Sequence, residues 1–180
     1  MRLLQNEQFL HWAAERGITL DMKYKAPQTL IMSGEEQLAV PHPVQCRQMR
    51  VLIARTVSLF RDHEAYLWRR GGKWEQHTKV GADGIDIREG VYQNFEKLGI
   101  PMREVTLCFE PGEHDLLACI IWLNASVAWK APDDLFLVRS DGLLLVHYDS
   151  DEYVFIMTPR SAAGSALRNE IQGTFRLERT

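Results

Sequence analysis

The stretch 134–159 constrains the fold more than any other part of this sequence. It contains three apolar runs separated by two short polar turns, at residues 135–139, 143–148 and 153–158. The first turn holds Asp141-Gly142, a pair that favours a tight two-residue hairpin loop because both positions need a positive φ. The second turn, 149–152, is acidic. The stretch therefore predicts a three-stranded antiparallel meander, apolar on both faces, so that each face needs a cover.

Three helices are expected upstream of this stretch. The first covers about 4–16 and ends at Gly17, a residue that readily adopts the left-handed conformation after a helix. The second has one apolar stripe at helical spacing, formed by Met49, Leu52, Ile53, Val57 and Phe60. The third covers 86–98, where Asp86 caps the start and Gly99 ends the helix.

The remaining segments are expected to be strands, loops and a short helix. Gly71-Gly72 joins two runs into a predicted hairpin, 65–70 with 73–78. The apolar segment 116–129 suits either a buried helix or a long strand, and its β-branched and aromatic residues favour the strand. The other expectations are an edge strand at 29–32, a loop at 34–43, a strand at 105–110, a loop at 160–165, a helix at 166–172 and a strand at 174–177.

Together these elements predict a single α+β domain over 1–180, with about three helices packed on one face of a mostly antiparallel sheet that ends in the meander. Within that domain, 1–100 is the helix-rich part with a β-hairpin at 65–78. Residues 101–160 supply the antiparallel strands, and 161–180 form a C-terminal tail.

Composition narrows the class of protein. A net charge of −3 argues against a general nucleic-acid binder, which needs a basic field. Three widely spaced cysteines, Cys46, Cys108 and Cys119, lie in apolar runs and suit a reducing compartment. The first residues lack the apolar run of a signal peptide, and the longest apolar run, 116–123, is too short to cross a bilayer. A cytoplasmic location is expected, without membrane or nucleic-acid partners.

Candidate chemistry is confined to two predicted turns. Glu113, His114 and Asp115 lie in one turn, while His147 and Asp149 lie at the end of a strand. Antiparallel neighbours could bring His114 and His147 together as an acid–base pair or a metal site. The spacing matches no established ligand pattern, and neither a nucleophile elbow nor a dinucleotide fingerprint occurs. The expectation is no enzyme, no metal and no cofactor; the alternative is a small hydrolase or nuclease that uses His114, His147 and nearby carboxylates.

The same region suggests a surface for protein binding. The acidic turn could simply be a solvated turn, it could meet a basic partner, or its carboxylates could bind calcium, although the twelve-residue calcium-loop pattern is absent. The two tryptophans of the predicted hairpin could form a partner-binding face or a lid on the core. The candidate partner-binding residues are Asp149, Asp151, Glu152, Tyr148, Trp68 and Trp74.

One stretch resembles a known group of proteins. Residues 144–155 read Leu-Leu-Val-His-Tyr-Asp-Ser-Asp-Glu-Tyr-Val-Phe and are similar to the closing strands of small bacterial proteins of toxin–immunity loci. The resemblance implies a cytoplasmic antidote that binds and blocks a cognate toxin, and it transfers no catalytic residue.

The hypothesis drawn from the sequence is therefore a non-enzymatic bacterial immunity protein, a toxin inhibitor that occludes the active site or substrate face of its toxin. The acidic turn would supply charge complementarity, and Trp68, Trp74 or Tyr148 would anchor the contact. A structural protein that associates with itself is a further alternative, and the oligomeric state is left open.

Overall fold

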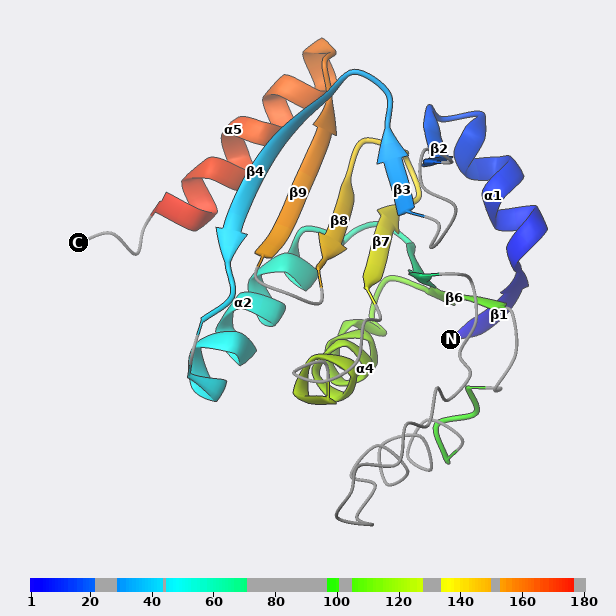
Figure 1. Cartoon of the computed structure of the whole chain (residues 1–180), viewed down its shortest axis with the longest axis vertical. Helices are drawn as coiled ribbons and strands as arrows, with labels where there is room; N and C mark the ends of the chain where they lie inside the picture. Colours follow the sequence, from blue (N-terminus) through cyan, green and yellow to red (C-terminus); the bar gives the residue numbers. More distant parts are fainter. Residues whose placement is uncertain are drawn as a thin grey trace.

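The computed structural model describes residues 1–21, 29–43, 45–70, 97–100, 105–127, 134–149 and 153–176. Within these residues the fold is α+β, with four helices and a mostly antiparallel sheet (Figure 1). The helices are α1 (Asn6–Ala14), α2 (Cys46–Ser58), α4 (His114–Val127) and α5 (Ala162–Arg176). The strands are β1 (Arg2–Gln5), β2 (Ile18–Asp21), β3 (Thr29–Met32), β4 (Glu35–Pro41), β5 (Ala65–Arg69), β6 (Val105–Phe109), β7 (Leu135–Arg139), β8 (Leu145–Tyr148) and β9 (Tyr153–Pro159).

The main sheet has seven strands in the order β1-β6-β5-β7-β8-β9-β4, and β2 and β3 form a separate two-stranded sheet. The strands β7, β8 and β9 pair in chain order, as the apolar runs of 134–159 predict. The meander does not end the sheet, because β4 pairs along the whole of β9 and α5 follows it in the chain. The main sheet therefore contains four described strands in addition to the meander of β7, β8 and β9.

Helices cover both faces of the main sheet, which corrects the expectation of a single covered face. One apolar cluster joins α2, α4 and α5 to side chains such as Leu67, Leu137 and Val146; we call this side the α2 face. The other cluster joins α1, β2 and β3 to Tyr66, Val138 and their neighbours; we call this side the α1 face. Figure 1 shows α1 beside β2 and β3, apart from the other three helices. The two covers are needed because β5, β6 and β7 are buried at every position.

The strand predicted at 116–129 is the clearest wrong prediction: 116–127 belong to the helix α4 (His114–Val127), and 128–129 lie outside the described residues. Leu117, Ile120 and Ile121 are fully buried at i, i+3 and i+4, the spacing of one helix face. The backbone carbonyl of Glu113 accepts the first helical hydrogen bond, from Leu117 N at 3.1 Å. A helix that is apolar on most of its surface is stabilised by burial, and this outweighs the strand propensity of its residues.

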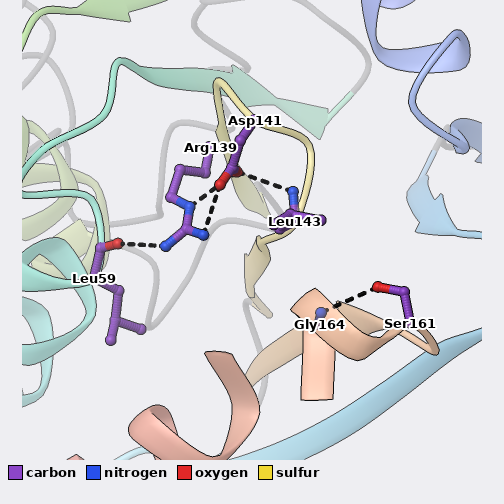
Figure 2. Close-up of polar contacts among 6 residues, drawn as sticks. All are labelled: Leu59, Arg139, Asp141, Leu143, Ser161 and Gly164. Carbon is purple, nitrogen blue, oxygen red and sulfur yellow. Dashed lines mark hydrogen bonds and ion pairs between the residues drawn. The ribbon is translucent and has the colours of Figure 1, made fainter. Parts of the chain in front are cut away.

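Two further corrections concern the edge strand and the chain end. Residues 34–43 were expected to form a loop, yet 35–41 form β4, which takes its regular structure from its pairing with β9. The predicted strand at 174–177 is wrong over 174–176, which belong to α5. The start of α5 is marked by Ser161, whose Oγ accepts a hydrogen bond from Gly164 N at 3.1 Å (Figure 2). This is the usual geometry of a serine N-cap, and it places the helix start before the predicted residue 166.

Several other expectations are met. The first helix exists, ends before Gly17 with its φ of 74°, and is preceded by the short strand β1. The predicted stripe of the second helix is buried within and just after α2, and the strands at 29–32 and 105–109 form as β3 and β6. The first half of the predicted hairpin is β5; its second half, 73–78, and nearly all of the predicted helix 86–98 lie outside the described residues. The predicted hairpin is nevertheless wrong for 65–67, because both edges of this part of β5 already pair with other strands, β6 and β7.

The turn between β7 and β8 is wider than a two-residue loop and is held by Arg139. Gly142 has a φ of 74°, whereas Asp141 keeps an ordinary negative φ. The Arg139 guanidinium donates two hydrogen bonds to the Asp141 carboxylate, from Nε at 2.9 Å and from Nη2 at 2.7 Å (Figure 2). Its Nη1 donates to Leu59 O at 3.3 Å, just after α2. The buried arginine thus ties the turn to the end of a helix on the α2 face.

The turn is also fitted closely to α1. Gly142 has a left-handed backbone, which favours glycine. The position also has no space for a side chain, because a Cβ added there would lie 2.8 Å from Cβ of Arg16. The β7–β8 turn therefore touches the covers of both faces, through Leu59 on one side and Arg16 on the other.

A pH-dependent contribution from Asp141 follows. Burial raises the pKa of its carboxyl, but the hydrogen bonds from Arg139 and Leu143 N outweigh burial, and the net pKa lies below the ordinary value. A depressed native pKa stabilises the fold above the unfolded-state pKa of roughly 4, and that stability is lost as pH falls through the native pKa. Asp141→Asn should lower the free energy of unfolding by about 1–3 kcal/mol at pH 7. Urea unfolding should show that the difference in free energy of unfolding between the unchanged protein and Asp141→Asn becomes smaller below pH 4. A difference that stays constant down to pH 2 would contradict a stabilising role of the ionised Asp141 carboxylate.

Candidate functional site

A row of aromatic rings crosses four strands on the α1 face. Strand register places Trp68 opposite Phe136, Phe136 opposite His147 and His147 opposite Phe155. The ring centroids are 5.5 Å apart for the first pair, 4.3 Å for the second and 5.7 Å for the third. The rings of Phe136 and His147 are nearly parallel, at 13°. We call these four residues the aromatic row; contacts of this kind stabilise sheets through cross-strand neighbours.

The aromatic row runs from the core to the surface. Trp68 and Phe136 have no exposed area, and the His147 side chain is 12% exposed. Phe155 is partly buried and stacks on Tyr153, with centroids 5.8 Å apart and an angle of 27°. Tyr153 itself is 38% exposed. Beyond the row, Tyr153 is therefore an aromatic side chain that stacks on the last ring of the row and is open to solvent.

A charged cluster adjoins the buried end of the row. One carboxylate oxygen, Asp134 Oδ2, lies 3.2 Å from Arg70 Nη1 and 3.1 Å from His147 Nε2. The backbone of Arg70 also donates to Asp134 O, at 2.9 Å. The His147 contact has the distance of an ion pair but not the alignment of a hydrogen bond, since Nε2 is without a well-directed acceptor. We call Arg70, Asp134 and His147 the charged cluster.

Asp149, the residue after β8, lies near the exposed Tyr153. Asp149 N donates to Tyr153 O at 3.0 Å, which places the backbone of these two residues side by side. Asp149 also acts on His42, which follows β4. Burial lowers the pKa of His42, and the charge of Asp149 and a backbone hydrogen bond at Tyr153 oppose this only in part. Asp149 is thus a half-buried carboxylate next to the exposed Tyr153.

The other predicted partner-binding residues have different positions. Trp68 is fully buried in the aromatic row, so the structure favours the alternative in which it covers the core. Tyr148 is 5% exposed and lies on the α2 face, where its hydroxyl contacts Thr56 Oγ1 and burial raises its pKa. Neither side chain offers a surface to a partner. Asp151, Glu152 and Trp74 lie outside the described residues.

The predicted pair of histidines is not brought together. His114 begins α4, and its Nε2 lies 3.1 Å from Phe60 O, against the end of α2. His147 lies on the α1 face and has Asp134 as its carboxylate instead. The rings that contact His147 belong to Phe136 and Phe155, and neither side chain can act as a nucleophile in catalysis. Among the residues that the structure describes, no group of three or more His, Cys, Asp or Glu side chains could hold a metal ion.

Sequence reasoning missed Arg70, Asp134 and Tyr153 as site residues. Arg70 and Asp134 flank buried strands and become neighbours only through the pairing of β5 with β7. A signal was present for Asp134, a charged residue that directly precedes an apolar run, whereas Arg69 separates Arg70 from the apolar residues of β5. Tyr153 was assigned to a strand, and its exposure follows from its place at the strand's end.

Comparison of the chain with protein-family models, with curated proteins and with solved structures finds no match. No helix in the described part of the chain is long and apolar enough to span a membrane.

The charged cluster predicts a large cost for removing its carboxylate. Asp134→Asn would remove the carboxylate that pairs with the largely buried Arg70 guanidinium and lies beside His147, and should lower the free energy of unfolding by about 3 kcal/mol. Asp62→Asn, at an exposed position, is the matched control and should change it by less than about 0.5 kcal/mol. Urea denaturation at pH 7 measures both. Equal effects of the two substitutions would show that solvent, and not Asp134, balances the charges of the cluster.

Proposed function

We propose that this protein acts by binding another protein, as a bacterial immunity protein that neutralises a cognate toxin. The observation that carries the proposal is the exposed Tyr153, stacked on Phe155 and adjacent to Asp149. We call Tyr153 and Asp149 the Tyr153 surface. The proposal includes a cytoplasmic location and no enzymatic step.

Tyr153 has the properties of an interface anchor. Tyrosine is enriched among residues that dominate binding energy, because it buries a large rigid area and also offers a hydroxyl. The stacking on Phe155 restricts the Tyr153 ring before binding, so less side-chain entropy is lost on association. Large hydrophobic side chains are also exposed at Leu3, Ile31 and Val51, but Tyr153 is the one that extends an ordered row of rings.

The acidic residues near Tyr153 in the sequence indicate the kind of partner that this protein would bind. Asp149 is followed in the sequence by Asp151 and Glu152, which makes the β8–β9 turn acidic in a chain of net charge −3. An acidic turn beside an aromatic anchor suits a basic surface on the partner, and the charges would speed association more than they add affinity. The toxin as partner rests on the resemblance of 144–155 to proteins of toxin–immunity loci. Occlusion of the toxin's active site or substrate face is the mechanism that we propose.

The test begins with capture of the tagged full chain's partner from its native host at physiological salt, identified by mass spectrometry. With the purified partner, Tyr153→Ala should weaken binding by at least about 30-fold, the loss typical of an interface anchor. Ile31→Ala also removes an exposed large hydrophobic side chain and should leave affinity unchanged. The triple change of Asp149, Asp151 and Glu152 to Ala should slow association and flatten its salt dependence.

The immunity role has its own readout. Expression of the captured partner should arrest growth of a bacterial host, and co-expression of this chain should restore growth, less well with Tyr153→Ala. Unchanged affinity in both the tyrosine and the triple variant would contradict the proposed surface. A harmless partner would contradict the toxin assignment and leave only protein binding.

A second candidate function is favoured by one contact, the 3.1 Å separation of His147 Nε2 and Asp134 Oδ2. A carboxylate beside an imidazole is a common arrangement for acid–base catalysis, so the alternative is a small hydrolase or nuclease centred on His147 without His114. His147→Phe preserves an aromatic ring in the row and should abolish turnover of any substrate found by screening. Turnover that survives this substitution would remove the enzyme alternative.

A further inference from the structure

The α1 face holds, on and just after β5, two buried hydrogen-bond donors for which no described residue supplies an acceptor. Trp68 Nε1 and Arg70 Nε are both buried, and neither has a hydrogen-bond partner among the described residues. Trp68 and Arg70 are two residues apart along β5 and its immediate extension, so both side chains leave the strand on the same face. A buried donor without an acceptor costs about 1–3 kcal/mol, and two of them on the same face of one strand need an explanation.

The position of Arg70 leaves one edge of its guanidinium open. Nη1 is committed to Asp134 Oδ2 at 3.2 Å, while Nε, on the other edge, has no acceptor in the described part of the chain. The edge that includes Nε is the one that arginine uses for side-on, two-bond recognition of carboxylates and phosphates. The Arg70 side chain is 24% exposed although its Nε is buried, so a small solute would approach the Nε edge from the exposed part of this side chain.

The same chain shows what such an edge holds when an anion is present. Arg139 uses one nitrogen, Nη1, for Leu59 O and directs Nε and Nη2 at the two carboxylate oxygens of Asp141. Arg70 repeats the first half of this arrangement, with Nη1 bound to a fixed acceptor. The second half, an oxyanion on the Nε edge, is not supplied by the described residues.

We propose that the charged cluster and Trp68 form a binding site for a small oxyanion, a carboxylate or a phosphate, which accepts hydrogen bonds from Arg70 Nε and Trp68 Nε1. Asp134 holds Arg70 in place and is held in turn beside His147. The aromatic row supplies a buried wall at which such hydrogen bonds are stronger than in water. The site goes beyond the proposed protein-binding function and does not depend on it, because it involves neither Tyr153 nor Asp149.

The Trp68 indole N–H is a direct reporter of this site. The ¹⁵N-labelled full chain contains five tryptophans, and the signal that disappears in Trp68→Phe identifies Trp68. Sodium acetate and sodium phosphate are titrated separately at pH 7, with sodium chloride added to hold the ionic strength constant. The Trp68 indole signal should shift and saturate with at least one probe, and the comparison of the two distinguishes a carboxylate site from a phosphate site.

Two arginine variants provide the contrast. Arg70→Gln should weaken the saturable response at least about tenfold, the value of one charge-assisted hydrogen bond. Arg70→Lys keeps the charge but lacks the side-on edge, and should weaken it as well. Arg16→Gln is the matched control: the Arg16 guanidinium lies 4.4 Å from the ring centroid of Trp12, another arginine–tryptophan pair, and its loss should leave the Trp68 response unchanged.

Three outcomes would overturn the proposal. The first is no saturable shift of the Trp68 indole with either probe, which would mean that water satisfies the two donors. The second is a linear drift shared with the Trp12 indole, which would indicate a general salt effect. The third is an unchanged response in both folded Arg70 variants. None of these results bears on whether Tyr153 contacts a protein partner.

Discussion

The burial of three central strands on both faces is the constraint on which the rest of this structure depends. Every residue of β5, β6 and β7 is buried, so the sheet requires one cover from α2, α4 and α5 and another from α1, β2 and β3. Burial also dictates where polar groups are paired, because an unpaired charge in such a sheet is costly. Arg139 meets Asp141, and Asp134 meets Arg70 and His147. The candidate site is thus a product of the same constraint as the core.

Local sequence predicts those elements whose residues carry their own signal. The strands at 29–32, 105–109 and 135–139 and the stripe of α2 could be predicted from periodicity and flanking turn residues. The helix α4 could not, because a segment apolar on most sides has no clear period and takes its structure from what surrounds it. The strand β4 could not be predicted either, since it forms by pairing with β9, which is distant from it in the sequence.

Only part of the candidate site could be predicted from the sequence, because residues alternate between the two faces of a strand. Alternate residues of a strand point to opposite faces, so His147 and Tyr148, neighbours in the acidic stretch, lie in different layers of the molecule. The partner-binding residues predicted from consecutive sequence positions therefore included Tyr148, which lies in the core on the α2 face, together with residues of the α1 face. Arg70 and Asp134 became visible only when the register of β5 with β7 was known, because contacts across strands are set by pairing rather than by spacing.

The strand order has a consequence for how the chain is made. At one edge of the sheet, Arg2 lies opposite Cys108, and at the other, Pro41 lies opposite Tyr153. During synthesis, β1 must wait for β6, and β4 must wait for β9, before either can enter the sheet. Pairings between distant residues slow folding and expose unpaired strand edges in the meantime. The nascent chain of this protein should therefore depend on protection until its last strand has left the ribosome.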